Sequence, residues 1–207
     1  MDVNQLALEY SAELPMWVLE ELVDVPDTFE SDEDKMRLVN VLARRNYREG
    51  TGGPFAALVI DSTTNELVSA GVNLVLGSGL SSSHAEVVAL SLAQTRIGNW
   101  DLGADPEHPR ELVVNWRPCV QCYGAVMWSG VKRLVVAGDG PELEHLTRFD
   151  EGPMVEDWAA QFEARGIEVV QDVLRDEAIE VYREYGESVD SGDVTVYNAR
   201  GTGPTGD

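Results

Sequence analysis

The strongest constraint on this chain comes from two short motifs, His84-x-Glu86 and Cys119-x-x-Cys122, which lie on either side of its midpoint. The chain has only two cysteines, and both are in the second motif. Two thiolates and one imidazole suit Zn²⁺ and leave a fourth position open for water. Glu86, two residues from the histidine, is then placed to move protons rather than to bind metal. The fold has to bring these two segments together.

Other uses of these residues remain open at this point. A Cys-x-x-Cys motif also occurs in thioredoxin-like redox proteins and in purely structural zinc sites. A redox pair would need neither His84 nor Glu86, and a structural site would want a fourth protein ligand. The other histidines, His108 and His145, both lie in polar, loop-like surroundings. We therefore favour a catalytic zinc site.

The charge of the chain limits its partners. It has 37 acidic residues against 15 lysines and arginines, a formal net charge of -22. This negative charge repels the phosphate groups of nucleic acids, and the chain has few of the Lys and Arg residues that would be needed to neutralise them. An acidic, solvated surface that keeps the protein soluble is the plainest interpretation. We expect no nucleic-acid partner and a small-molecule substrate.

The chain carries no apolar run near 18 residues, and its beginning lacks the basic and apolar regions of a signal peptide. We therefore expect no membrane partner. Two cysteines at metal-binding spacing are typical of a reducing compartment, which indicates a cytoplasmic location. With 207 residues, the chain can bury a core as one domain with an extension.

Strands and helices alternate along most of the chain, which predicts an α/β fold with a mixed sheet between helical layers. Residues 1–50 are expected to form an N-terminal helical extension, 51–185 the zinc-dependent domain and 186–207 a C-terminal tail. The expected strands are 55–61, 67–76, 111–116, 131–137 and 167–171. The expected helices begin near Ser31, His84, Pro118, Met154 and Leu174.

Both motifs fall at expected helix N-termini. Free backbone N–H groups and the positive end of the helix dipole favour thiolate over thiol there. The spacing of Cys119 and Cys122 puts both sulfurs on one face of a single turn. Each helix follows a strand, so the two first turns should meet at one end of the sheet, where ligands gather in open α/β folds.

His-x-Glu followed by Pro-Cys-x-x-Cys is the signature of zinc-dependent nucleobase and nucleoside deaminases, so the chain resembles the cytidine-deaminase-like superfamily. Three pieces are similar to guanine deaminases: residues 52–57 (Gly-Gly-Pro-Phe-Ala-Ala), 83–87 (Ser-His-Ala-Glu-Val) and 118–128 (Pro-Cys-Val-Gln-Cys-Tyr-Gly-Ala-Val-Met-Trp). The related tRNA adenosine deaminases share the zinc residues, but they typically carry His at the position of Trp128.

The resemblance implies a three-layer α/β/α fold with a five-stranded mixed sheet, zinc as the cofactor and a homodimer as the assembly. It also suggests Asn73 as the side chain that hydrogen-bonds the base, with Phe55 and Trp128 as aromatic walls. The alternatives are a strand cap for Asn73 and core packing for the two rings. In guanine deaminases a C-terminal segment can close over the site; here that segment carries Tyr185 and Tyr197.

The chain departs from guanine deaminases next to both motifs. Residues 80–83 (Leu-Ser-Ser-Ser) replace their usual Asn-Asp-Pro-Thr, and Arg117 stands where they usually have Glu. A cation beside the zinc would accept an anionic group of the substrate; otherwise Arg117 is a structurally paired or solvent-facing arginine. These departures leave the zinc chemistry intact and put guanine itself in question.

We predict a hydrolase acting on C–N bonds, a zinc-dependent deaminase of a small amino-substituted heterocycle, with guanine favoured. His84, Cys119 and Cys122 would hold Zn²⁺, and Glu86 would carry protons. A nucleoside, a pterin or another aminated ring is the alternative substrate. A non-catalytic, zinc-stabilised binding module is the alternative from another class, and the presence of Glu86 argues against it.

Overall fold

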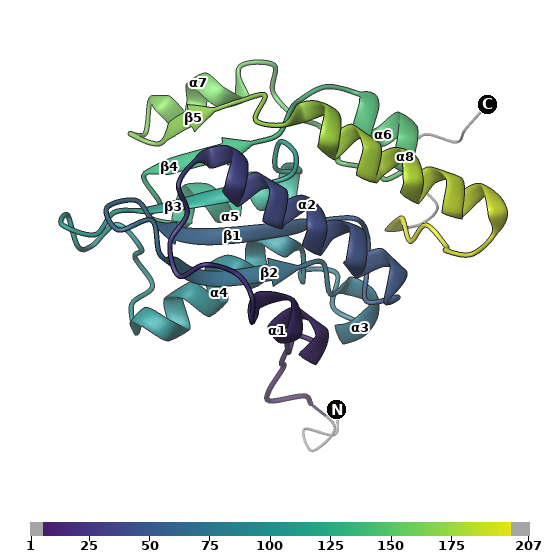
Figure 1. The fold of residues 1–207 in the computed structure, drawn as a ribbon, viewed down its shortest axis with the longest axis horizontal. Helices are drawn as coiled ribbons and strands as arrows, with labels where there is room; N and C mark the ends of the chain where they lie inside the picture. Colours follow the sequence, from purple (N-terminus) through teal and green to yellow (C-terminus); the bar gives the residue numbers. More distant parts are fainter. Residues whose placement is uncertain (1–5, 200–207) are drawn as a thin grey trace.

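The computed structural model describes residues 6–199, and a five-stranded sheet forms its centre (Figure 1). The strands are β1 (Ala56–Asp61), β2 (Leu67–Val72), β3 (Arg110–Val114), β4 (Arg133–Val136) and β5 (Glu168–Val170). They lie in the order β2-β1-β3-β4-β5. Strand β1 is antiparallel to β2 and β3, whereas β3, β4 and β5 are parallel to one another. The predicted mixed sheet is confirmed.

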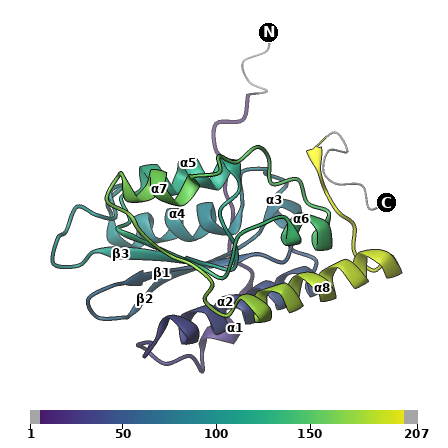
Figure 2. The same ribbon diagram turned by 90° about the horizontal axis from the view of Figure 1, so that it is seen from above.

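Helices cover both faces of this sheet. In the described residues they are α1 (Met16–Leu22), α2 (Asp32–Arg48), α3 (Val75–Ser78), α4 (Ala85–Ile97), α5 (Val120–Ser129), α6 (Glu142–Thr147), α7 (Trp158–Glu163) and α8 (Arg175–Ser191). Figure 2 shows α4, α5 and α7 on one face and α2 and α8 on the other. This is the predicted three-layer arrangement. Between residues 6 and 199, no helix is both long enough and apolar enough to cross a membrane.

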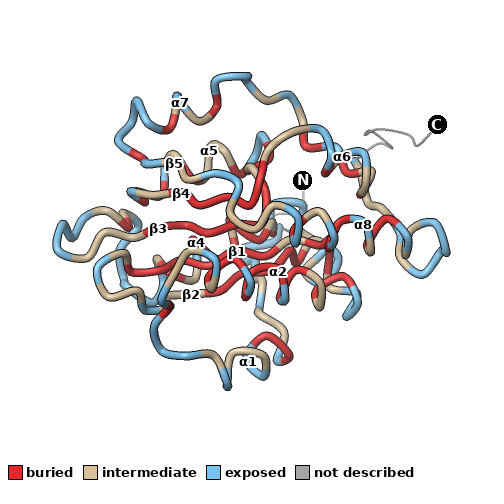
Figure 3. The backbone as a smooth tube through the Cα atoms, turned by 45° about the horizontal axis from the view of Figure 1, so that its top comes forward, coloured by how far each residue is buried: buried red, intermediate tan, exposed pale blue. Residues whose placement is uncertain are grey.

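Strand β1 divides its side chains between two halves of the core. Leu58 and Ile60 pack in the cluster that includes buried residues of α2 and α8, whereas Ala57 and Val59 pack with residues of α4, α5 and α7. The alternation follows from the two-residue period of a strand. Figure 3 shows the sheet as the most continuously buried part of the chain. An apolar run of this kind is what a central strand needs, since both of its faces are covered.

Local sequence determines where the helices begin and how closely they approach the sheet. Helix α2 begins after Ser31, whose Oγ accepts the Asp34 N–H at 3.2 Å, as the capping pattern predicted. Helix α4 lies directly on β2, because a Cβ at Gly71 would come 2.4 Å from the carbonyl oxygen of Ala85. Only glycine allows the first turn of α4 to approach the strand this closely.

Two elements differ from the sequence expectations. Strand β2 ends at Val72 instead of continuing to residue 76, because Asn73 Oδ1 accepts the Val75 N–H and starts helix α3. Helix α8 continues to Ser191, past the boundary expected at residue 185. Helix α2, expected in the extension, packs fully buried residues such as Val39 into the core. We propose that both helices belong to the same folded unit as the sheet.

A buried ionic cluster ties α2 to the sheet. Lys35 Nζ donates to Glu111 Oε1 at 2.7 Å, and Arg133 Nη1 donates to Glu111 Oε2 at 2.7 Å. Both cations also pair with Asp32. Glu111 is 1% exposed, so its two oxygens depend on these donors in place of water.

Replacing Lys35 by Met is expected to lower the free energy of unfolding by about 3 kcal/mol, because it leaves the buried Glu111 with one charge partner instead of two. The matched control is Arg37→Met on the same helix. It removes an exposed pair with Asp34 and is expected to change stability by less than about 0.5 kcal/mol. Urea denaturation followed by circular dichroism measures both, and equal losses would contradict this account of the cluster.

Candidate active site

The residues expected to bind metal come from the starts of two neighbouring helices. His84 is the N-cap of α4, Cys119 is the N-cap of α5, and Cys122 lies in the first turn of α5. Strand β3 leads into α5 through residues 115–119, and α4 packs on β2 and against α5. The first turns of α4 and α5 therefore meet beyond the carboxyl ends of β2 and β3.

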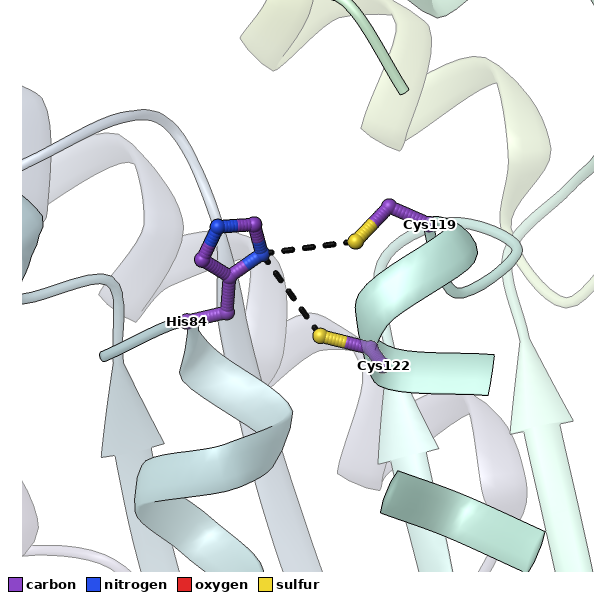
Figure 4. A group of neighbouring side chains, drawn as sticks. All are labelled: His84, Cys119 and Cys122. Carbon is purple, nitrogen blue, oxygen red and sulfur yellow. Dashed lines mark hydrogen bonds between the residues drawn. The ribbon is translucent and has the colours of Figure 1, made fainter. Parts of the chain in front are cut away.

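Three potential ligand atoms converge at this point (Figure 4). His84 Nδ1 lies 3.4 Å from Cys119 Sγ and 3.6 Å from Cys122 Sγ. Tetrahedral zinc, with Zn–N of about 2.0 Å and Zn–S of about 2.3 Å, requires an N···S separation of about 3.5 Å. The residues present therefore fit zinc. Within the described part of the chain the group has no fourth protein ligand, which is typical of catalytic rather than structural sites.

These side chains also set one another's protonation. The pKa of Cys119 falls to about 4, first because Cys122 hydrogen-bonds its sulfur and then because His84 does. The same bond to Cys119, together with burial, raises the pKa of Cys122. Burial lowers the pKa of His84, but its hydrogen bond to Cys119 and the negative charges of Cys119, Glu86 and Glu151 together outweigh this and raise the pKa to about 9. Such a cluster releases protons when it binds a divalent cation.

Glu86 lies in the first turn of α4 and is 6% exposed. Burial raises the pKa of its carboxyl, and the charge of the Cys119 thiolate raises it further. His84 and a hydrogen bond to Cys122 act in the opposite direction. A carboxyl in this environment can accept a proton and return it near neutral pH.

A cavity of about 330 Å³ lies beside these groups. His84, Glu86 and Cys119 are on its wall together with Asn73 and Phe55. Asn73 follows β2 and Phe55 precedes β1, so the antiparallel pairing brings them to the same edge of the sheet. The Asn73 N–H donates to the Phe55 carbonyl at 3.0 Å. The fold thus gathers the expected base-binding residues next to the expected catalytic ones.

Phe55 has one side in the core and one at the cavity. Its ring centroid lies 5.5 Å from that of Phe149 and 6.0 Å from that of Tyr182. The residue is only half-buried and lines the cavity. Core packing and a wall for the base, the two roles considered for it, are therefore compatible.

Arg117 also lies on the cavity wall, and Asp139 holds its side chain. Arg117 Nε donates to Asp139 Oδ1 at 2.6 Å, and the side chain is 10% exposed. Its Nη1 is buried and has no hydrogen-bond partner among the residues described. Arg117 is thus a structurally paired arginine whose charge lies close enough to lower the pKa of the nearby Glu151.

Trp128 does not reach the cavity. Its side chain is 82% exposed on α5 and is absent from the cavity wall. At about 100° per residue, the nine positions from Cys119 carry Trp128 about 180° around the helix, away from the ligands. Neither role expected for it, stacking on the base or packing in the core, matches this placement within one chain.

Glu151 is a cavity residue that no sequence motif marks. Burial raises its pKa to about 8, and the charges of Cys119 and Glu86 add to the effect. Its carbonyl oxygen accepts the Val120 N–H at 3.0 Å, which ties its loop to the cysteine helix. It follows α6 in a stretch without periodicity and is one of 37 acidic residues, so no local signal distinguishes it.

The C-terminal segment lies over the cavity of its own chain. Tyr197 and Asn198 are on the cavity wall. Tyr185 is not; it packs behind the wall, with its ring centroid 5.6 Å from that of Phe149. Of the two tyrosines noted in this segment, Tyr197 is therefore the one placed to meet a ligand.

The two remaining histidines lie outside the ligand group. His108 Nδ1 is 2.8 Å from Asp61 Oδ2, at the opposite end of β1 from the cavity. His145 is on α6 and is absent from the group of potential ligands.

Replacing Cys122 by Ser is expected to reduce zinc binding to a substoichiometric level, because the site loses one of its two thiolates. His145→Asn is the control and should keep the zinc content of the unchanged chain. Elemental analysis after dialysis against a weak chelator measures both. Retention of zinc by the serine variant, or loss of zinc from the His145 variant, would contradict the assignment.

Solved structures are similar to this chain over most of its length. A guanine deaminase from Nitrosomonas europaea is 41% identical, with 87% of this chain and 97% of that chain covered and a TM-score of 0.79. A protein in complex with 2,6-diaminopurine is 41% identical, with 94% and 98% covered and a TM-score of 0.80. Among curated sequences, the tRNA-specific adenosine deaminase of Buchnera aphidicola is 24% identical over 75% of this chain and 95% of its own length.

Residues 29–138, just over half of the chain, match the family described as the cytidine and deoxycytidylate deaminase zinc-binding region. The match runs from the residues before α2 to the end of β4, so it contains both motifs and the central strands. An imidazole and two thiolates beside a buried carboxyl are the groups that hydrolytic deamination needs. The chain therefore belongs to the cytidine and deoxycytidylate deaminase family and is a zinc-dependent hydrolytic deaminase.

Proposed function

We propose that this deaminase acts on a free purine base and that guanine is its substrate. The main support for the proposal is the cavity of about 330 Å³, whose wall includes His84 and Cys119 of the ligand group together with Glu86, Asn73 and Phe55. That volume is at the small end of ligand pockets and suits a single base. The similar structures support the same class, since one is named a guanine deaminase and others hold 8-azaguanine or 2,6-diaminopurine.

In this proposal His84, Cys119 and Cys122 hold zinc. The Lewis acidity that zinc would supply there lets a water molecule lose a proton near neutral pH, and the resulting hydroxide can attack an aminated ring carbon. Glu86 takes the proton from that water and delivers it to the ring nitrogen beside the attacked carbon. The same carboxyl then takes the proton of the newly added hydroxyl group and passes it to the amine, so that the C–N bond breaks, ammonia departs and an oxo group remains on the ring carbon.

Glu151 would serve as a second acid in the cavity. Because burial raises its pKa to about 8, the carboxyl is largely protonated at neutral pH. A neutral carboxylic acid can donate a hydrogen bond to a ring nitrogen or to the departing amine. Asn73 would hold the edge of the base, and Phe55 would cover one of its faces.

Two observations favour a free base over a base within a polynucleotide. Tyr197 and Asn198 lie on the cavity wall, and the chain has a formal net charge of -22. A polynucleotide would have to bring its phosphates to this wall against that charge. A nucleoside, a pterin or another aminated ring is the second candidate, and the charge of Arg117 beside the cavity favours a ring with an anionic group.

We also propose a cytoplasmic location for the enzyme. Both cysteines are free thiols and belong to the ligand group. Thiols used in this way have to remain reduced, which a reducing compartment ensures.

The zinc-loaded protein is expected to release ammonia from guanine, within a panel of aminated bases, nucleosides, pterins and tRNA. Glu86→Gln should keep its zinc and its melting temperature but lower kcat by about 10²- to 10⁴-fold, because the proton carrier is lost. Glu163→Gln, at an exposed position of α7, is the control and should leave kcat unchanged. Ammonia release from tRNA alone, or from none of the compounds, would contradict the proposal.

We further propose that α5 forms the contact of a homodimer. Val120, Gly124 and Trp128 are spaced by four residues and so share one face of the helix. Val120 is 49% exposed and Trp128 is 82% exposed. A Cβ at Gly124 would meet no atom within 4 Å, so no contact in the described chain explains a glycine in mid-helix. A second copy packed on this face would cover the exposed side chains of Val120 and Trp128 and fill the open space beside Gly124.

Trp128→Glu is expected to convert the dimer into a monomer, because a central interface tryptophan contributes about 2 kcal/mol or more, or about 30-fold in the dissociation constant. Trp100→Glu is the matched control: Trp100 is 72% exposed in the loop after α4 and should not affect assembly. Sedimentation equilibrium measures both variants. A monomeric unchanged chain, or a dimeric Trp128 variant, would contradict the proposed interface.

A further inference from the structure

The hydrogen bonds around Asn73 determine which way its amide faces. Asn73 is 3% exposed, and its Oδ1 accepts the Val75 N–H at 3.2 Å. A backbone N–H can only donate, so the side-chain atom opposite it has to be the amide oxygen. The orientation of the amide therefore follows from the chemistry of its neighbour.

Tyr197 uses the remaining acceptor capacity of this oxygen. The Gly53 N–H donates to Tyr197 Oη at 2.8 Å, and the Tyr197 hydroxyl donates to Asn73 Oδ1 at 2.7 Å. Because the Gly53 N–H cannot accept, the hydroxyl has to direct its own hydrogen at Asn73. Asn73 Oδ1 thus receives two donors, and both of its lone pairs are in use.

Only the amide nitrogen of Asn73 is left for a ligand. Asn73 lies on the cavity wall, and within residues 6–199 its Nδ2 has no hydrogen-bond partner. The residue therefore offers N–H donors and no acceptor. A ligand atom at this position has to accept a hydrogen bond, as a ring oxo group or an unprotonated ring nitrogen does. An exocyclic amine at this position would place its own N–H donors opposite those of Asn73 Nδ2, and no hydrogen bond could form between them.

The position of the Tyr197 hydroxyl is itself well supported. Its ring packs edge-on against Phe149, with the centroids 4.9 Å apart. The neighbouring Asn198 donates from Nδ2 to the Arg148 carbonyl at 2.7 Å and accepts the Asp150 N–H at 3.0 Å on Oδ1. These contacts dock the tail on the loop after α6, so the bond from Tyr197 to Asn73 is part of a built cavity wall.

We propose that Tyr197 is a specificity-determining positioning residue. By holding Asn73 as a pure hydrogen-bond donor, it makes the site select an aminated purine with an oxo group over the same purine with an amine in that place. The inference rests on the proposed function, because it concerns how a purine is read in this cavity. Tyr197 acts through Asn73 and needs no contact with the reacting atoms.

The test compares guanine with 2,6-diaminopurine, which carries an amine in place of the oxo group. In Tyr197→Phe the oxygen of Asn73 keeps the Val75 N–H but loses the tyrosine donor, so one of its lone pairs becomes available to accept a hydrogen bond from an exocyclic amine. The ratio of kcat/KM for guanine to that for 2,6-diaminopurine is expected to fall by about 10-fold or more, with zinc content and melting temperature unchanged.

Tyr185→Phe is the matched control. It removes a hydroxyl from the same aromatic cluster, with the ring stacked on Phe149 at 5.6 Å. In the part of the chain that the structure describes, this hydroxyl makes no hydrogen bond, and Tyr185 is not on the cavity wall. The control should leave the substrate ratio unchanged.

Dissociation constants of the two purines, measured in the zinc-loaded Glu86→Gln background, give a second readout that does not depend on turnover. The same fall in the guanine to 2,6-diaminopurine preference is expected on adding Tyr197→Phe. An unchanged ratio, or equal changes for both purines, would overturn the proposal, because Tyr197 would then be only a cover for the site. If the unchanged chain binds and discriminates the purines but deaminates neither, only the proposed function fails.

Discussion

Two helices can hold one ion between their first turns only when the strands before them end at the same edge of one sheet. Here β3 leads into α5, and α4 rests on β2 through the close approach at Gly71. His84 and Cys119 become N-caps, yet neither side chain makes a capping hydrogen bond. A good cap contributes about 1 kcal/mol to a helix. Helices α4 and α5 both lack this stabilisation, and the side chains of His84 and Cys119 are therefore free to act as ligands.

The surroundings of a buried carboxyl, more than its burial, decide its role in this acidic chain. Glu111 lies between Lys35 and Arg133, so its oxygens are occupied and the residue holds α2 against the sheet. Burial raises the pKa values of Glu86 and Glu151, and the thiolate charge of Cys119, in place of a paired cation, raises them further. A raised pKa is what proton transfer near neutral pH requires. The acid that holds α2 on the sheet and the two acids proposed to transfer protons thus differ in their neighbours.

Local patterns predicted most of the architecture and the metal site. Apolar runs indicated the five strands, and the spacing within each motif indicated that both first turns would carry ligands, because these features depend on a few adjacent residues. Trp128, expected to form a wall for the base, lies outside the cavity of its own chain, since a shared motif does not by itself tell which face of a helix a residue occupies. Glu151 and the bond from Tyr197 to Asn73 could not be predicted. The two bonded residues are 124 positions apart, and only the assembled fold brings them together.

In the function proposed for this chain, an open zinc site with one imidazole and two thiolates from the protein lies directly beside the base. X-ray absorption at the zinc edge, recorded with and without 8-azaguanine, tests it most directly. Two sulfur scatterers at about 2.3 Å and lighter atoms at about 2.0 Å are expected, and the lighter-atom shell should change when the purine analogue binds. A zinc centre whose ligands are all protein atoms and do not respond to the analogue would contradict the account.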